Sequence, residues 1–176
     1  LLCYFRAGVG GMPLWLKIAR RHGKHRTWAW AMLYNCAVFA LVPLLGPGDM
    51  VAYLAVCLTT GLALGADLLL PPSMQADVVD VDTEAGGDQR TALYFAIWSM
   101  ATKLAQALAV GIAFPLLDLL GFAAGAANTG MAQFGLVALY AGAPVIFKLV
   151  AVALAWNFPL DAAKQEALRR RIDAAG

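Results

Sequence analysis

The sequence predicts an all-α membrane protein, a helical bundle of about five transmembrane helices. Of its 176 residues, 61% are hydrophobic and 14% are charged, and the mean hydropathy is +0.69. An ordinary soluble domain is about a quarter charged and half apolar. The apolar residues also form runs of about 20 residues, the length a helix needs to cross a hydrocarbon core of about 30 Å. These observations exclude a disordered chain, a nucleic-acid-binding module and an ordinary secreted domain.

Five apolar segments have this length or come close to it. Because backbone groups in lipid must pair internally, and the runs lack the alternation of barrel strands, we expect each to be a helix. The first is short, which fits a helix that begins upstream of the sequence. The expected helices are 1–16, 27–46, 50–73, 91–120 and 135–158, which together form a transmembrane bundle over 1–158.

Glycine and proline add detail to these helices. The small-xxx-small pair Gly61 and Gly65 predicts close helix packing. Pro71-Pro72 is expected to end or kink the third helix, and Pro144 marks a possible kink in the last. Pro159 ends the last helix and opens a basic tail, 159–176.

The basic residues predict the orientation. Nine of the thirteen Lys and Arg fall in 17–26 and in the tail, and such clusters stay in the cytoplasm. With five helices, 74–90 is then cytoplasmic as well, whereas 46–49 and 121–134 lie outside. The expected location is the plasma (inner) membrane, with Trp28 near a membrane interface and Trp98 about two turns deep.

Some ionisable side chains lie within the apolar segments, where each costs at least about 2.5 kcal/mol by insertion scales and is a functional candidate. Lys103 follows Thr91 by about 18 Å at 1.5 Å per residue, near the bilayer midplane. Ser99 and Gln106 share its helix face. This stripe favours a water-filled cavity; the alternative is a structural lysine neutralised by a partner acid such as Asp67. For Lys148, a pairing role is nearly as plausible as a transport role.

Several other chemistries find no support in the sequence. The three cysteines lie in apolar runs and are expected to pack rather than form disulfides. His22 and His25 have no acid or Cys at metal-ligand spacing, and catalytic and phosphate-binding motifs are lacking. The sequence therefore predicts no enzyme, no metal site, no organic cofactor and no nucleic-acid partner; the lipid bilayer is the expected surrounding.

Two stretches carry a family resemblance. Residues 11–26 (GMPLWLKIARRHGKHR) resemble the cytoplasmic loop signature of major facilitator superfamily transporters, with Pro13 in place of the usual acid, as in the sugar symporter branch. The second stretch comprises MQADVVDVD at 74–82, GDQR at 87–90 and LYFAIWSMATKL at 93–104. It resembles the region around the penultimate helix of the glycoside–pentoside–hexuronide:cation symporters, the melibiose permease group.

The resemblance covers nearly the whole chain. It implies the later part of the C-terminal six-helix half of a major facilitator fold, and symport of a sugar with H⁺ or Na⁺ by alternating access. Lys103 matches a family lysine in the coupling and sugar region, whereas Lys148 matches no recognised family feature. The family's main cation-binding acids lie in the N-terminal half, so that half is an expected partner, together with a sugar substrate.

The expected site has two parts. The substrate and coupling path comprises Lys103, Ser99, Gln106, Thr102, Asp67 and Lys148. The cytoplasmic gating loops comprise Lys17, Arg20, Arg21, Gly23, Lys24, Arg26, Asp77, Asp80 and Arg90. In one conformation only, the cations of the first loop would meet acids or helix ends. The alternatives are another major facilitator permease or exporter for drugs or peptides, and a non-transporting membrane assembly or sensor subunit.

Overall fold

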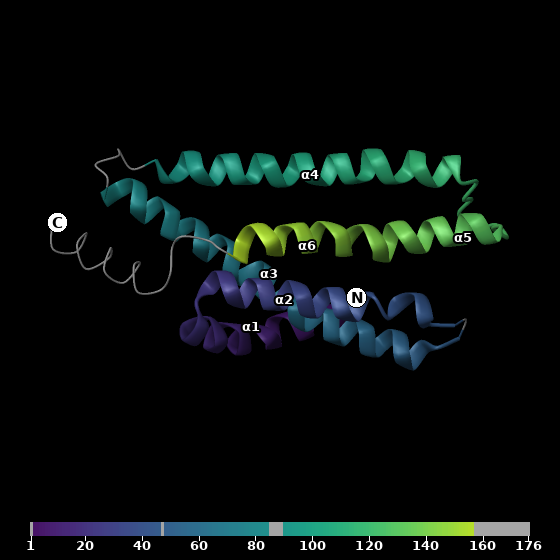
Figure 1. Ribbon diagram of the computed structural model, residues 1–176, viewed down its shortest axis with the longest axis horizontal. Coiled ribbons are helices and arrows are strands. Elements are labelled where there is room, and N and C mark those ends of the chain that lie inside the picture. Colours follow the sequence, from purple (N-terminus) through teal and green to yellow (C-terminus); the bar gives the residue numbers. More distant parts are fainter. Residues whose placement is uncertain (1, 47, 85–89, 157–176) are drawn as a thin grey trace.

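The computed structural model describes residues 2–46, 48–84 and 90–156, and helices dominate these residues (Figure 1). In chain order the elements are α1 (Leu2–His22), α2 (Lys24–Phe39), η1 (Val42–Leu44), α3 (Met50–Glu84), α4 (Thr91–Leu119), α5 (Gly130–Val137), η2 (Ala138–Gly142) and α6 (Ala143–Trp156). Four helical runs are long and apolar enough to cross a membrane: Lys24–Leu44, Met50–Glu84, Thr91–Leu119 and Gly130–Trp156. The predicted all-α membrane fold is confirmed.

The helices run side by side, and their connections alternate between the two ends of the bundle. Figure 1 places the corner between α1 and α2 at the same end as the C-terminus of α3 and the N-terminus of α4. The connections from α2 to α3 and from α4 to α5 lie at the opposite end. This is the alternation that helices crossing one membrane in succession require.

The expected basic loop 17–26 is almost entirely helical. α1 continues to His22 and α2 begins at Lys24, so Gly23 alone makes the corner between them. Its φ of +87° lies in the left-handed region, which a residue with a Cβ rarely adopts. The basic side chains are therefore carried on the ends of two helices that meet at Gly23.

The expected end of the third helix near Pro71-Pro72 is not observed, because α3 continues to Glu84. The two prolines remove two backbone donors, a loss that neighbouring helices can compensate within a membrane protein. Leu70 supports the continuation, since it packs in a buried cluster with Trp15, Ala19, Ala31 and Ala66 of α1, α2 and α3. A helix of 35 residues is about 52 Å long. It therefore extends well beyond a core of about 30 Å, and it carries much of the expected loop 74–90.

The last helical run begins at Gly130, earlier than the expected residue 135, and contains a π turn, η2. Pro144 lies two residues after the end of this turn. A proline lacks the backbone donor and its ring crowds the carbonyl group four residues earlier, here that of Tyr140. The wider π turn relieves that conflict. The structure is described to Trp156, so residues 157–158 of the expected helix and the whole tail 159–176 lie outside the described residues.

The closest helix packing joins α1 and α3, which confirms the packing predicted from Gly61 and Gly65. A Cβ atom added to Gly61 would lie 2.5 Å from the Tyr4 carbonyl oxygen, and one added to Gly65 would collide with the Gly8 carbonyl oxygen. From the other side, a Cβ on Gly11 would lie 2.9 Å from the Leu62 carbonyl oxygen. Trp15 ties the same helices together by donating its indole N–H to that oxygen, at 2.7 Å.

α4 stands apart from this core. None of its residues is buried, and within the described chain its main contacts are with α3 and α5. Figure 1 shows it as the outermost helix, on the far side of α6 from α1 and α2.

Candidate functional site

Three helices meet at one carboxylate inside the bundle. The ammonium nitrogen of Lys148 on α6 donates to Oδ2 of Asp67 on α3, at 3.0 Å. The indole N–H of Trp28 on α2 donates to Oδ1 of the same carboxylate, at 2.8 Å. Both carboxylate oxygens therefore accept a hydrogen bond, each from a different helix.

The Asp67–Lys148 pair lies within the apolar part of the bundle but is not sealed. Lys148 precedes the end of α6 at Trp156 by eight residues, or about 12 Å along the helix. The side chains of Lys148 and Asp67 are 26% and 31% exposed. Pairing lowers the cost of holding these charges in lipid, while the exposure leaves both groups within reach of a ligand.

The pair opens into a cavity of about 570 Å³, the charged cavity. Its walls come from α2, α3, α4 and α6. Besides Asp67 and Lys148, they include Trp28, Met32, Trp98 and Thr102. Phe147 lines it too, so the charged cavity combines one ion pair with three aromatic side chains.

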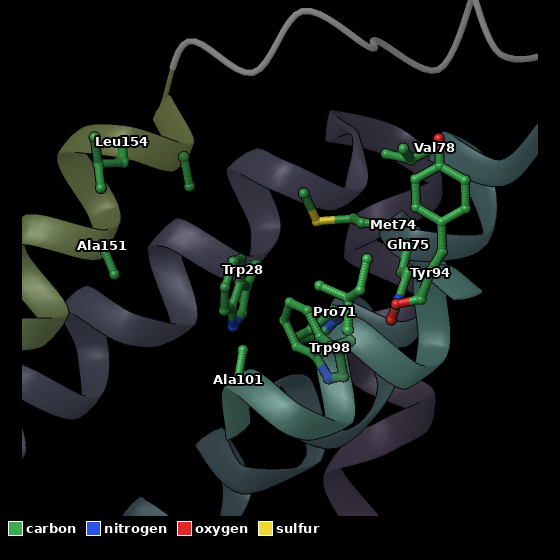
Figure 2. A pocket seen from close by; sticks show the side chains of 12 residues that line it. Trp28, Pro71, Met74, Gln75, Val78, Tyr94, Trp98, Ala101, Ala151 and Leu154 are labelled. Atoms are coloured by element: carbon green, nitrogen blue, oxygen red, sulfur yellow. The ribbon is translucent and has the colours of Figure 1, made fainter. Parts of the chain in front are cut away.

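A second cavity of about 550 Å³, the apolar cavity, lies beside the first. The two share Trp28, Pro71, Trp98 and Ala151, and Figure 2 shows these side chains with Met74 and Leu154 around the apolar cavity. Gln75 is its main polar side chain, and it donates to the Tyr94 carbonyl oxygen at 2.7 Å, linking α3 to α4. The two cavities therefore form a charged and an apolar compartment with common walls.

A second ion pair lies at the end of the bundle where α1 meets α2. The ammonium nitrogen of Lys24 is 2.7 Å from both carboxylate oxygens of Asp77, and it also donates to the Ser73 carbonyl oxygen at 3.3 Å. Asp77 is buried, at 5% exposure. The pair joins the first turn of α2 to the part of α3 that follows Pro71-Pro72.

The structure brings together some of the predicted path residues and separates others. Asp67, Lys148 and Thr102 line the charged cavity. Lys103, Ser99 and Gln106 are exposed on α4 and line neither cavity. The alternative in which Asp67 neutralises Lys103 is not what the structure has, because Lys148 and Trp28 occupy that carboxylate. The transport role of Lys103 stays a prediction.

Of the predicted gating residues, Lys24 and Asp77 are brought together, and Gly23 makes the corner beside them. Asp80 is half-buried on α3. The remaining members are exposed: Lys17, Arg20, Arg21, Arg26 and Arg90. Their role as a conformational latch stays a prediction.

Sequence reasoning missed the part that tryptophan takes in this site. Trp28 was expected at a membrane interface, yet it orients Asp67, and Trp98 lines both cavities. A signal was available, since an indole N–H away from water usually finds an acceptor. Asp67, an acid within a neighbouring helix, is the acceptor that this indole N–H finds.

Comparison with known proteins gives a family. The family model described as MFS/sugar transport protein matches residues 1–162. Sodium-dependent lysophosphatidylcholine symporter 1 of Homo sapiens is 24% identical over 179 residues, which cover 99% of this chain and 32% of that protein. The Mus musculus protein of that name gives 24% identity over 179 residues, with 99% and 33% coverage. Symporter 1-A of Danio rerio gives 24% over 172 residues, with 94% and 32% coverage.

The chain thus spans about a third of the length of these curated relatives. The match over nearly the whole chain confirms the predicted superfamily, while the melibiose permease group is a finer assignment that stays a prediction. This multi-pass membrane chain belongs to the MFS/sugar transport protein family of the major facilitator superfamily.

Proposed function

We propose that the protein is a cation-coupled secondary transporter of the plasma (inner) membrane that works by alternating access. This chain would contribute the later part of its C-terminal half. The observation that supports this most is the Asp67–Lys148 pair, held by three helices and open to a cavity within the apolar zone. Transporters of this kind keep substrate and coupling sites near the bilayer midplane, with polar groups facing a cavity.

The substrate class we propose first is a lysophospholipid. Three relatives carry names that assign them lysophosphatidylcholine and sodium. The apolar cavity supports the same class, because a long hydrocarbon chain gains free energy from burial against Pro71, Met74 and Leu154, whereas a sugar gains little there. Sodium is then the first candidate for the coupling ion.

A sugar is the second candidate. The resemblance of 74–104 to the melibiose permease group favours it, as does the family's own description. The charged cavity also offers aromatic rings and an ion pair, groups that can stack on a pyranose and bind its hydroxyls. In this version the coupling ion is H⁺ or Na⁺.

The Lys24–Asp77 pair would act as part of a cytoplasmic gate in either case. It joins α2 to the part of α3 that follows Pro71-Pro72, at the end of the bundle that carries the exposed cations of 17–26. A change of conformation that brings the cations of 17–26 close to other acids would also alter the Lys24–Asp77 contact.

The substrate can be tested with the full-length protein in proteoliposomes. With an inward sodium gradient, we expect time-dependent uptake of labelled lysophosphatidylcholine into a pool that external albumin cannot extract. Labelled melibiose should show no uptake beyond that of protein-free liposomes. Melibiose uptake without lysophospholipid uptake would establish the second candidate, and gradient-driven uptake of neither would overturn the substrate proposal.

A further inference from the structure

We propose that the charged and apolar cavities form one two-part site for a single-chain amphiphile with a phosphate group. Lys148 binds that phosphate group, and its ion pair with Asp67 breaks when the ligand binds. The inference rests on the proposed function for the class of substrate. It goes further in assigning the recognising residue and in making the Asp67–Lys148 pair displaceable by the ligand.

The first step concerns hydrogen-bonding capacity. A lysine ammonium group has three donors, and within the described residues Lys148 makes one hydrogen bond, to Asp67. The carboxylate of Asp67, by contrast, already accepts on both oxygens, from Trp28 and from Lys148. Two donors of the Lys148 ammonium group are therefore left for a ligand. A ligand group rich in acceptors and negative charge, such as the phosphate group of a lysophospholipid, complements it.

The second step concerns the neighbouring space. The two cavities share four wall residues, and the apolar one measures about 550 Å³, within the usual range for small-molecule sites of about 300–1,000 Å³. A hydrocarbon chain attached to the phosphate would extend past Trp28 and Trp98 into the apolar cavity (Figure 2). A charged cavity beside an apolar one thus matches a ligand with a charged headgroup and a single hydrocarbon chain.

The third step concerns competition for Lys148. Asp67 and a bound phosphate are rival acceptors for one ammonium group, so that removal of the Asp67 charge should strengthen phosphate binding. Removal of the Lys148 charge should weaken it. A pair with only a structural role behaves differently, because loss of either partner leaves an uncompensated charge in an apolar place and disturbs the site in the same direction.

The test measures binding to the full-length protein in nanodiscs, without any ion gradient. The probes are radiolabelled 1-palmitoyl-lysophosphatidate, monopalmitoylglycerol, which has the same chain without phosphate, and glycerol 3-phosphate, which has the phosphate without a chain. For the wild type we expect lysophosphatidate to bind about ten times more tightly than monopalmitoylglycerol. We expect glycerol 3-phosphate to bind at least a hundred times more weakly than lysophosphatidate.

The variants separate the roles of the two charges. Lys148→Gln should lose the preference for lysophosphatidate and keep wild-type binding of monopalmitoylglycerol, which also reports that the site is folded. Asp67→Asn should bind lysophosphatidate several times more tightly. Lys148→Arg should keep the preference. The double variant Asp67→Asn with Lys148→Gln holds no unpaired charge and should bind both lipids alike. Arg6→Gln, which removes an exposed cation of α1, is the matched control and should change neither affinity.

Three results would overturn the inference: equal weakening of lysophosphatidate binding by Lys148→Gln and Asp67→Asn, an unchanged preference in Lys148→Gln, or glycerol 3-phosphate bound as tightly as the lipid. The last result would mark a site for free phosphate. Since the binding assay uses no gradient and no choline lipid, it can succeed where lysophosphatidylcholine uptake fails, and the reverse, so the two proposals fail separately.

Discussion

At the scale of single residues, Asp67 stands out because its carboxylate joins α2, α3 and α6. The hydrogen bond from Trp28 fixes one oxygen and leaves the other for Lys148. A half-buried acid bound in this way orients its partner cation, so that Lys148 is held in the wall of the charged cavity.

The contribution of Trp28 can be measured with Trp28→Phe, which keeps an aromatic ring and removes the N–H donor. A hydrogen bond to a charged group contributes about 1.5–3 kcal/mol, so we expect the melting temperature of the purified full-length protein to fall by several degrees. Trp30→Phe, on the exposed side of the same helix, is the control and should leave it unchanged. Equal melting temperatures for the two variants would contradict the role of this hydrogen bond.

Lys103 leads to a prediction about transport. The lysine is exposed on α4, and the resemblance assigns it to the coupling region. Lys103→Ala should abolish coupled uptake while membrane insertion stays normal, as judged by surface yield. Leu104→Ala, which shortens the next exposed side chain on the helix, should retain uptake. Wild-type uptake in Lys103→Ala would remove this residue from the mechanism.

Sequence reasoning predicted part of this site. Asp67 and Lys148 were recognisable as candidates because each is an ionisable side chain in an apolar run. Their pairing was not predictable, since it depends on which faces α3 and α6 turn toward each other. For the same reason the sequence left Asp67 as an example of a partner acid for Lys103, an equally deep cation, in the alternative interpretation of that lysine.

At the scale of helices, the contact between α1 and α3 depends on glycine. A Cβ on Gly11 meets the Leu62 carbonyl oxygen, whereas a Cβ on Gly10 meets nothing within 4 Å. Gly11→Ala should therefore separate the two helices and lower the free energy of unfolding by about 1–3 kcal/mol. The melting temperature should fall accordingly. Gly10→Ala should leave the stability unchanged or raise it slightly. If both substitutions have the same effect, close packing at Gly11 is not what holds these helices together.

The Lys24–Asp77 pair allows a prediction about the corner between α1 and α2. Asp77→Asn removes the charge that holds Lys24 and should loosen the first turn of α2. We expect faster limited trypsin cleavage after Arg20, Arg21 or Arg26, followed by mass spectrometry of the fragments. Asp82→Asn on the same helix is the control. Equal cleavage rates in the two variants would show that the pair does not hold this corner.

The helices illustrate what a sequence determines at this scale. Their number and order follow from apolar runs longer than a soluble core allows. The end of α3 was not predictable from the sequence. Pro71-Pro72 is a local pattern that ends helices, whereas the packing of Leu70 against α1 and α2 favours continuation of the helix. The corner at Gly23 was also missed, since the basic run around it is equally typical of a loop and of two helix ends.

At the scale of the whole molecule, the helix connections alternate between the two ends of the bundle in Figure 1. Which end faces the cytoplasm stays a prediction from the basic residues. The 17–26 corner and the Lys24–Asp77 pair share one end, while the Asp67–Lys148 pair lies further into the bundle. In the proposed mechanism, this arrangement would separate the cytoplasmic gate from the binding site, as alternating access requires.

The most direct test of the central claim, a cation-coupled transporter, is the accumulation of lysophosphatidylcholine by sealed proteoliposomes that contain the full-length protein. We expect accumulation above the equilibrium level with an inward sodium gradient. That accumulation should collapse when a sodium ionophore dissipates the gradient. Uptake that reaches only the equilibrium level, at a rate independent of sodium and of the ionophore, would contradict it.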